Sequence, residues 1–225
     1  MIYIVIGVFI VLVLLREVYI ATHIQISPYV EAICQTSDGS VLLTFDDGPN
    51  VENTPKVLDV LRKYNVKAFF FCVGKEAENH PDIVRQIVEE GHAVGQHTYW
   101  HNPFHNFYTR SIYEHELRKA HGVFQSIGID IKMFRPPLGI TNWVVGRSVK
   151  DLGYKVVGWS VRSFDTRNES REKVLERVKK SMAHGSIILL HDRIEGADWL
   201  AEEIIRYAML NGMKLYGQTE KQTNI

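Results

Sequence analysis

With 225 residues, 45% of them hydrophobic and 23% charged, the chain has the composition of a globular protein with room for one large domain, not of a disordered, collagen-like or low-complexity chain. The 26 basic residues balance the 26 acidic ones, so no basic excess indicates a nucleic-acid partner. Two cysteines, Cys34 and Cys72, are too few for a disulfide framework.

The first predicted element is a hydrophobic N-terminal helix. An apolar run extends from Ile2 to Leu15 and is interrupted only by Gly7. With the following residues through Ala21, which include Arg16 and Glu17, the segment reaches the roughly 20 residues that a membrane-spanning helix needs. A cleaved signal peptide and a buried core helix are the alternatives. No basic region precedes the run, no small-residue cleavage site follows it at once, and no polar face marks it. We therefore expect residues 1–22 to be a membrane anchor or an uncleaved signal segment.

The rest of the chain divides into a connector over residues 23–37 and one domain over residues 38–220. In this domain apolar runs alternate about six times with amphipathic stretches, a pattern typical of parallel βα units. A barrel and a doubly wound sheet both fit this length, and in both the ligands bind at the C-terminal ends of the strands. The strands are expected over Val41–Asp46, Lys67–Val73, Ala93–Gln96, Met133–Arg135, Val156–Ser160 and Ile187–His191. The helices are expected over Thr54–Tyr64, Pro81–Glu90, Ser111–Ser126, Asn142–Leu152, Ser170–Ala183 and Asp198–Asn211.

Polar residues gather at the ends of these predicted strands. Because the C-terminal ends of parallel strands share one edge, we expect these side chains to meet there. The set combines acids, histidines and one arginine: Asp46, Asp47, His97, His101, Arg135, Asp165 and His191.

His97 and His101 are four residues apart, a spacing that on a helical turn places both imidazoles on one face as a metal clamp. The same spacing is compatible with two ordinary histidines at the rim. Asp46 and Asp47 favour the metal, because neighbouring side chains point in different directions, so one carboxylate can bind a metal while the other acts as a base. Two histidines and one aspartate leave coordination positions open for water and substrate. An Asx turn before Gly48 explains one of the two acids but not both.

At this point the sequence resembles a known family. Four motifs in order resemble the signature motifs of the polysaccharide deacetylases, the NodB-homology domains of carbohydrate esterase family four. These motifs are TFDDG at Thr44–Gly48, HTYWH at His97–His101, RPPLG at Arg135–Gly139 and LLH at Leu189–His191. The resemblance implies a distorted (β/α) barrel and the hydrolysis of N-acetyl groups, or in some members O-acetyl groups, on sugars.

The resemblance also implies a role for each motif residue. Asp47, His97 and His101 resemble the ligands of a divalent metal, with zinc as the first expectation and cobalt, nickel or iron as alternatives. Asp46 resembles the general base, which Arg135 orients, and His191 resembles the general acid, which Asp165 orients. The expected substrate contacts are Pro137, Leu138, Leu189 and Trp100, of which Trp100 belongs to an aromatic cluster with Phe104, Phe107 and Tyr108 that is either a sugar platform or a packed loop.

These roles form a consistent chemistry. A metal polarises the acyl carbonyl and lowers the pKa of a bound water to about 7 in good zinc sites. A base takes the proton of the attacking water, and an acid protonates the amine, which cannot leave as an anion. A backbone N–H near Leu138 is the expected donor to the oxyanion.

The sequence departs from the family pattern at three positions. Arg162 stands where the family often carries an acid, Thr166 where it carries a tryptophan that helps to line the acetyl pocket, and Leu138 where a tyrosine is common. The departures leave hydrolysis as the expected reaction and concern the substrate instead.

Other functions share part of these features. Non-haem iron oxygenases use two histidines and one carboxylate, but the βα alternation disagrees with their usual fold. Phosphotransferases of the aspartyl type space their acids by one residue, whereas Asp46 and Asp47 are adjacent. A cyclic amide hydrolase of the same fold and a non-catalytic carbohydrate-binding protein are the remaining alternatives.

The expected partners are an acetylated polysaccharide or oligosaccharide and, through the N-terminal segment, a membrane. We expect a single-pass protein whose catalytic domain lies outside the cytoplasm. Arg16, on the C-terminal side of the apolar run, by itself favours the opposite orientation, but one residue carries little weight in that rule.

Overall fold

The computed structural model of the chain describes residues 2–102, 104 and 108–218. Phe107 of the expected aromatic cluster and residues 219–220 of the expected domain lie outside the described residues. The strands are β1 (Ala32–Ile33), β2 (Leu42–Asp46), β3 (Phe69–Cys72), β4 (Ala93–Gln96), β5 (Met133–Phe134), β6 (Lys155–Val157), β7 (Val161–Arg162) and β8 (Ile187–His191). The α-helices are α1 (Ile2–Thr22), α2 (Thr54–Tyr64), α3 (Gly74–Asn79), α4 (Pro81–Glu89), α5 (Arg110–Ser126), α6 (Trp143–Asp151), α7 (Arg171–Ser181) and α8 (Ala197–Leu210), and short 3₁₀ turns cover Ile24–Ile26 and Pro137–Gly139.

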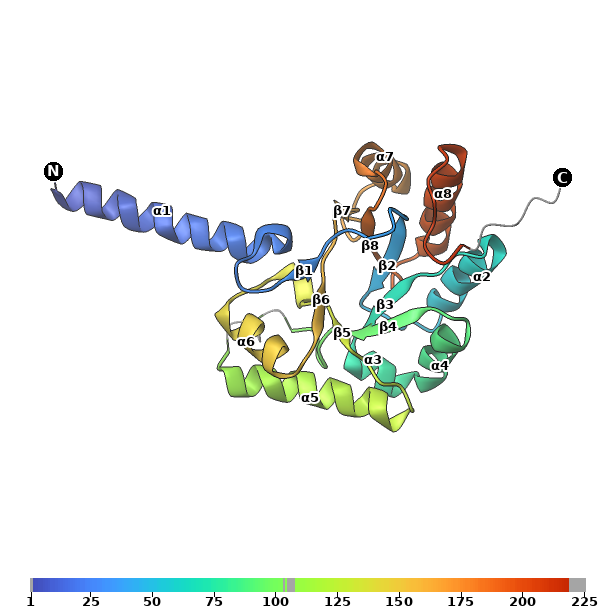
Figure 1. Cartoon of the computed structure of the whole chain (residues 1–225), viewed down its shortest axis with the longest axis horizontal. Helices are drawn as coiled ribbons and strands as arrows, with labels where there is room; N and C mark the ends of the chain where they lie inside the picture. The colour runs from blue at the N-terminus through green and yellow to red at the C-terminus, as the bar shows by residue number, and fades with distance from the viewer. Residues whose placement is uncertain (1, 103, 105–107, 219–225) are drawn as a thin grey trace.

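The strands form one parallel sheet in the order β1-β6-β5-β4-β3-β2-β8-β7. β7 follows β6 after only residues 158–160, yet the two strands pair near opposite ends of the sheet. One short segment reaches both ends only because the sheet curls round on itself. The fold is therefore the expected distorted (β/α) barrel, open between its two edges, and not a flat doubly wound sheet (Figure 1).

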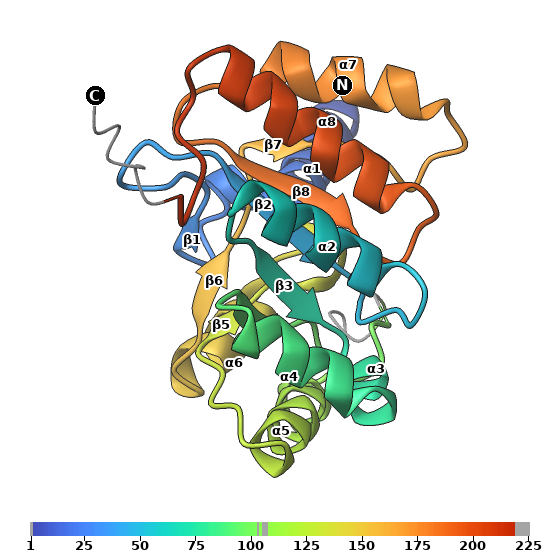
Figure 2. The same ribbon diagram turned by 90° about the vertical axis from the view of Figure 1, so that its right-hand side faces the viewer.

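The helices cover the outside of this curled sheet. α7 contacts α8, α8 contacts α2, and α2 contacts α4, so the helices follow the order of the strands that they cover (Figure 2). On the other side α3 and α6 both contact α5, which runs along the bottom of the view in Figure 1. This arrangement leaves the ends of the strands as the accessible part of the barrel interior.

Alternate residues of the buried strands belong to two separate cores. In β2, Leu43 and Phe45 belong to the core beneath α2 and α8, whereas Leu42 belongs to a second core together with Phe71 and Leu189. Because strand side chains alternate between faces, the polar residues of β2 lie on the same face as Leu42. Thr44 and Asp46 therefore point into the barrel, and both are buried.

α1 is long and apolar enough to cross a membrane by length and composition, and most of its surface is exposed in the structure. Figure 1 shows the helix extending away from the barrel. Its C-terminal end is fixed to the domain by a hydrogen bond from Thr141 N to Ala21 O (2.9 Å) and another from the Tyr29 hydroxyl to Glu17 (2.7 Å).

The segment expected as a connector contributes structure of its own. β1 pairs with β6 as an edge strand, and Ile24 is buried in the second core. The sequence pattern did not predict the two-residue strands β1 and β7, whereas it did predict β5, which is as short. Their pairing depends on neighbouring strands that lie far away in the sequence.

Candidate active site

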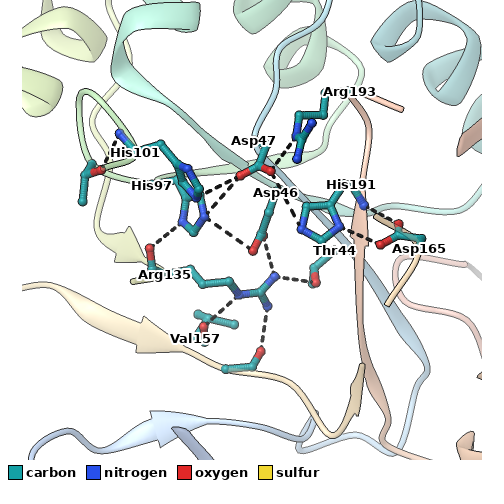
Figure 3. A network of polar contacts seen from close by, with 12 residues as sticks. Thr44, Asp46, Asp47, His97, His101, Arg135, Val157, Asp165, His191 and Arg193 are labelled. Carbon is teal, nitrogen blue, oxygen red and sulfur yellow. Dashed lines mark hydrogen bonds and ion pairs between the residues drawn. The ribbon is translucent and has the colours of Figure 1, made fainter. Parts of the chain in front are cut away.

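The predicted polar residues meet at the C-terminal ends of the strands, as parallel βα topology requires. Figure 3 shows Asp46, Asp47, His97 and His191 around one centre. They open into a pocket whose lining residues are Asp46, Asp47, His97, His101, Leu138, Gly139, Trp159, Arg162, Phe164, Thr166, Leu189, His191 and Arg193.

The end of β2 supplies two carboxylates to this centre. Asp46 is the last residue of the strand, and Asp47 leaves it with a left-handed φ of 73°. This backbone turn, unfavourable for a residue with a Cβ, brings both carboxylates to His97: its Nε2 lies 3.8 Å from Asp46 and 3.5 Å from Asp47. Gly48 continues the turn against Asp192, whose Oδ2 would lie only 2.3 Å from an added Cβ.

His97 and His101 lie close together, with ring centroids 4.8 Å apart, but the expected helical turn is wrong. Residues 97–102 form an irregular loop in which Thr98 and His101 adopt left-handed φ values of 63° and 52°. The loop is held by the Gly74 N–H, which donates to Thr98 O (2.8 Å), and by the His101 N–H, which donates to Thr98 Oγ1 (3.1 Å). A hydrogen bond from Gly74 and one within the loop therefore hold the two histidines together, in place of the helical turn that we expected.

Asp47, His97 and His101 could hold a metal ion, because one ligand atom from each lies within 4.8 Å of the others. The Nδ1 of His97 donates to the carbonyl of Arg135 (2.6 Å), which only accepts, so the neutral ring presents the lone pair of Nε2 to the centre. The Oδ1 of Asp47 lies 3.2 Å from His101 Nε2, is buried, and has no hydrogen-bond partner among the described residues. A buried carboxylate oxygen that faces two imidazole nitrogens fits a divalent cation.

The charge states of these groups also suit a cation. Burial raises the pKa of Asp47, but the surrounding histidines and the hydrogen bond from Arg193 outweigh burial and lower this pKa to about 2. Burial and the neighbouring His97 lower the pKa of His101 to about 4. At neutral pH the aspartate is therefore ionised and the His101 imidazole is neutral, the states in which both groups bind metals.

Arg135 fixes the second carboxylate, that of Asp46. The arginine is fully buried and donates from Nη1 to Asp46 Oδ1 (2.7 Å) and to Thr44 Oγ1 (2.8 Å). Its Nε and Nη2 donate to the carbonyls of Val157 and Gly158. A buried guanidinium needs such complete pairing, because each unpaired donor would cost desolvation energy. Asp46 is thus held in one orientation with Oδ2 toward the centre.

His191 enters from the end of β8 on the opposite side from His97 (Figure 3). Asp165 binds it twice, since Oδ1 accepts from Nδ1 (2.7 Å) and Oδ2 accepts from the backbone N–H (2.8 Å). The Nε2 consequently faces the centre, 3.9 Å from Asp47 Oδ2. Burial lowers the pKa of His191, but the hydrogen bond and charge of Asp165 outweigh burial and raise it above its ordinary value.

The four predicted substrate contacts divide into two pairs. Leu138 and Leu189 line the pocket, and Leu138 is half exposed with a left-handed φ of 58°. Pro137 is buried in its 3₁₀ turn, and Trp100 is exposed on the histidine loop, where its ring contacts Tyr99; neither lines the pocket.

Arg193 and Trp159 are among the pocket residues that the sequence analysis did not select. Arg193 donates from Nε to Asp47 Oδ2 (2.7 Å), which leaves Oδ1 to face the imidazoles. Trp159 forms the wall beside Gly139, where an added Cβ would lie 2.2 Å from the indole. Arg193 lies two residues beyond the last predicted strand, so the rule that selected the other strand-end residues could have found it. Trp159 was placed inside a strand and gave no such signal.

Comparisons with known proteins agree with this geometry. A family model described as polysaccharide deacetylase matches residues 34–157, more than half of the chain. A peptidoglycan-N-acetylglucosamine deacetylase of Listeria monocytogenes is 36% identical over 152 residues, which cover 68% of this chain but 32% of that protein. The chain thus spans about a third of the length of this relative.

Two further proteins match over most of their length. A chitooligosaccharide deacetylase of Sinorhizobium fredii is 34% identical over 167 residues, which cover 73% of this chain and 78% of that protein. The crystal structure of a peptidoglycan N-acetylglucosamine deacetylase superposes with a TM-score of 0.75 at 30% identity, and the match covers 85% of this chain and 94% of that one. The likeness therefore includes both the amino-acid sequence and the curled barrel.

Proposed function

The chain belongs to the polysaccharide deacetylase family, and from that premise we propose that it is a metal-dependent hydrolase that removes N-acetyl groups from the amino sugars of a polysaccharide. One observation carries the proposal: Asp47, His97 and His101 turn their ligand atoms to one centre, while Asp46 and His191 face that centre from two sides. Amide hydrolysis needs a cation that polarises the carbonyl, a base that activates water and an acid that protonates the amine, and this arrangement would supply all three.

Asp47, His97 and His101 would hold the divalent metal. Their one carboxylate and two imidazoles suit zinc first, and cobalt, nickel or iron as alternatives. When bound, the cation would polarise the acyl carbonyl and make a water molecule more acidic. Arg193 holds the other oxygen of Asp47, so this carboxylate would bind through Oδ1 alone.

Asp46 would be the general base. Arg135 and the strand geometry hold its carboxylate beside the proposed metal ligands, where an attacking water would lie. Arg135 is a positioning residue: it is buried behind Asp46, and its four hydrogen bonds leave the carboxylate a single orientation. A proton-transfer group fixed in this way contributes on the order of 100–10,000-fold to the rate.

His191 would be the general acid. The departing amine needs a proton, and Nε2 of His191 faces the centre because Asp165 holds Nδ1. The raised pKa keeps more of this imidazole protonated near neutral pH than an unperturbed histidine would be. The need for such an acid is greatest for a nitrogen leaving group, which favours N-acetyl over O-acetyl substrates.

Leu138 and Leu189 would contact the acetyl methyl group, and Pro137 would hold the turn that carries Leu138. The backbone N–H of Leu138 would donate to the developing oxyanion, and loss of one such donor typically costs about 100–1000-fold in rate. Trp100 would contact the sugar chain farther from the reacting group, at the exposed histidine loop.

The proposed substrate is an acetylated amino-sugar polymer of the kind named for the relatives, a peptidoglycan or a chitooligosaccharide. Residues 38–220 would be the catalytic domain, residues 23–37 its connector, and residues 1–22 a single-pass membrane anchor that leaves the domain outside the cytoplasm. The bond from Thr141 to Ala21 ties α1 to the loop that follows Leu138, and the bond from Tyr29 to Glu17 ties it to the connector, so the anchor would be rigidly attached.

The test is acetate release by the purified full chain from N-acetylated chitooligosaccharides and from peptidoglycan. We expect release that exhaustive chelation abolishes and that added zinc or cobalt restores. Metal content, measured alongside, should fall and rise with the activity. Activity that survives complete removal of the metal would disprove the metal role, and the absence of acetate release from every acetylated glycan in the presence of metal would disprove the deacetylase.

A further inference from the structure

One wall of the pocket is built differently from the rest. It consists of Arg162 at the end of β7 and of Phe164, Thr166 and Arg167 in the turn that follows, and we call these four residues the outer wall. Arg162, Phe164 and Thr166 line the pocket. Arg162 and Thr166 are two of the three positions at which the sequence departs from the family pattern.

The guanidinium of Arg162 has no acidic partner within ion-pair distance among the described residues. Three other guanidinium groups near the pocket each have one: Arg135 binds Asp46, Arg193 binds Asp47, and Arg177 binds Glu169. Arg162 instead lies over two aromatic rings, 5.3 Å from the centroid of Trp159 and 4.8 Å from that of Phe164. Aromatic faces orient a guanidinium but leave its N–H edge free to bind an anion.

A second arginine strengthens this arrangement. Arg167 lies 4.0 Å from the centroid of Phe164 and has no ion-pair partner among the residues that the structure describes. Burial and the nearby Arg167 lower the pKa of Arg162, but an arginine stays charged at every physiological pH. Three guanidinium groups therefore lie over one ring beside the pocket, and only the third, that of Arg177, has an acidic partner. The repulsion between Arg162 and Arg167 would be relieved by an anion bound between or beside them.

The charges of the pocket also favour an anionic ligand at Arg162. The acids Asp46, Asp47 and Asp165 are matched by Arg135, Arg193 and His191. No carboxylate of the pocket is therefore left to neutralise Arg162. A positive charge in a concave site attracts anionic ligands.

We propose that Arg162, with Arg167 at the rim, binds an anionic oxygen group, a carboxylate or a phosphate, carried by the amino sugar beside the acyl group that is removed. The inference deepens the proposed function and rests on it. The anion belongs to the sugar because the acyl side of the pocket is apolar, formed by Leu138, Leu189 and Trp159. Arginine suits both anions, since its planar fork donates two parallel hydrogen bonds to either one. Thr166 lines the same pocket with a small side chain.

The test compares the binding of three sugars to the full chain as purified, by titration calorimetry. The probes are N-acetylglucosamine, which is neutral, N-acetylmuramic acid, which carries a carboxylate, and N-acetylglucosamine 1-phosphate. The variants are Arg162→Gln and, as a matched control, Arg206→Gln, which removes one exposed arginine from α8 on the outside of the barrel. Each affinity is expressed relative to that of the neutral sugar, so that a general weakening cancels.

We expect at least one acidic sugar to bind more tightly than the neutral one, and Arg162→Gln to reduce this ratio about tenfold to a hundredfold, the value of one or two charge-assisted hydrogen bonds. The Arg206→Gln chain should keep the ratio. A carboxylate-specific or a phosphate-specific preference identifies which anion the substrate carries. Equal binding of all three sugars, or a preference that persists in Arg162→Gln, would overturn the inference.

Acetate release from the same sugars, and from N-acetylated chitooligosaccharides, separates this inference from the proposed function. If no sugar loses acetate while the acidic preference depends on Arg162, the hydrolase fails and the anion site stands. If neutral and acidic substrates are hydrolysed at equal kcat/KM and bind equally, the hydrolase stands and the anion site fails.

Discussion

Arg135 in the floor of the pocket and Arg162 in its outer wall have opposite environments. On the floor, which we define as Thr44, Asp46, His97 and Arg135, the guanidinium of Arg135 is fully buried and each of its three nitrogens donates to an acceptor inside the protein. On the outer wall, Arg162 is half-buried and meets only aromatic faces.

The difference separates two tasks within one pocket. A guanidinium whose hydrogen bonds are satisfied inside the protein can only position a neighbour, here Asp46. A guanidinium whose donors are left open can bind something that comes from outside. The floor accordingly keeps the groups of the hydrolytic reaction, whereas the outer wall departs from the family pattern and is the part of the pocket that would select the substrate.

The largest expected effect comes from breaking the floor at Asp46. Asp46→Asn keeps an acceptor for Arg135 but removes the base, so kcat for acetate release should fall on the order of 100–10,000-fold while metal content stays unchanged. Asp46→Ala also leaves Arg135 buried without a counter-charge and should lower the free energy of unfolding by about 3–5 kcal/mol, measured by urea denaturation.

Asp59→Asn is the matched control, because Asp59 is an exposed carboxylate that pairs with Arg62 on the outside of α2. It should leave both quantities within experimental error. Wild-type turnover in Asp46→Asn would remove this residue from the mechanism and with it the contrast between floor and wall.

A smaller effect is expected at Asp165, which positions His191. Asp165 raises the pKa of His191, and the acid must be protonated to act, so kcat/KM should decline as the pH rises through this pKa. Asp165→Asn removes the charge and should move the decline to lower pH by about 1–3 pH units. The measurement is the pH profile of acetate release, and an unchanged basic limb would show that His191 is not the acid.

The smallest expected effect concerns stability and involves Asp192. Its carboxylate has no cationic partner within ion-pair distance among the described residues. Its Oδ2 accepts from Thr54 Oγ1 (2.6 Å), its Oδ1 has no partner among the described residues, and burial raises its pKa to about 7. The folded state therefore binds more protons than the unfolded state between about pH 4 and pH 7. Across this window the free energy of unfolding should fall as the pH rises, by at most about 1.4 kcal/mol per pH unit.

Asp192→Asn should remove this contribution, and the comparison of urea unfolding at pH 5 and pH 7.5 measures it. Metal content in both chains must be matched, because metal binding changes stability by mass action. An identical pH dependence in the two chains would show that Asp192 is already ionised in the folded protein. Such a result would remove the contrast between Asp192, whose lack of a cationic partner keeps it protonated, and Arg162, which stays charged without an acidic partner among the described residues.

Most of the repeating elements of the fold could be predicted from the sequence to within a residue or two. The strand Ile187–His191 and the helix Thr54–Tyr64 have the expected bounds, because continuous apolar runs and helical periodicity are local signals. The strand β6 ends at Val157, three residues before the expected Ser160, and the short helix α3 was not predicted. β1 and β7 were not predicted either, since each exists only as a partner of a strand far away in the sequence.

The site shows the same division. The sequence predicted which residues gather at the strand ends, but it placed the two histidines on a helical turn. Their loop instead depends on left-handed residues, Thr98 and His101, and on hydrogen bonds to the start of α3. Local propensity does not favour left-handed backbone for such residues, and only the surrounding contacts stabilise it.

By itself the sequence determined the chemistry available to this protein: three acids, two spaced histidines, one arginine and one further histidine at the ends of parallel strands, because such strands bring their C-terminal ends to one edge. The tertiary structure alone decided which oxygen of Asp47 faces the imidazoles, which arginine pairs with which acid, and that Arg162 pairs with no acid among the described residues. Those outcomes depend on distances between side chains that lie far apart in the chain, and no local pattern encodes such distances.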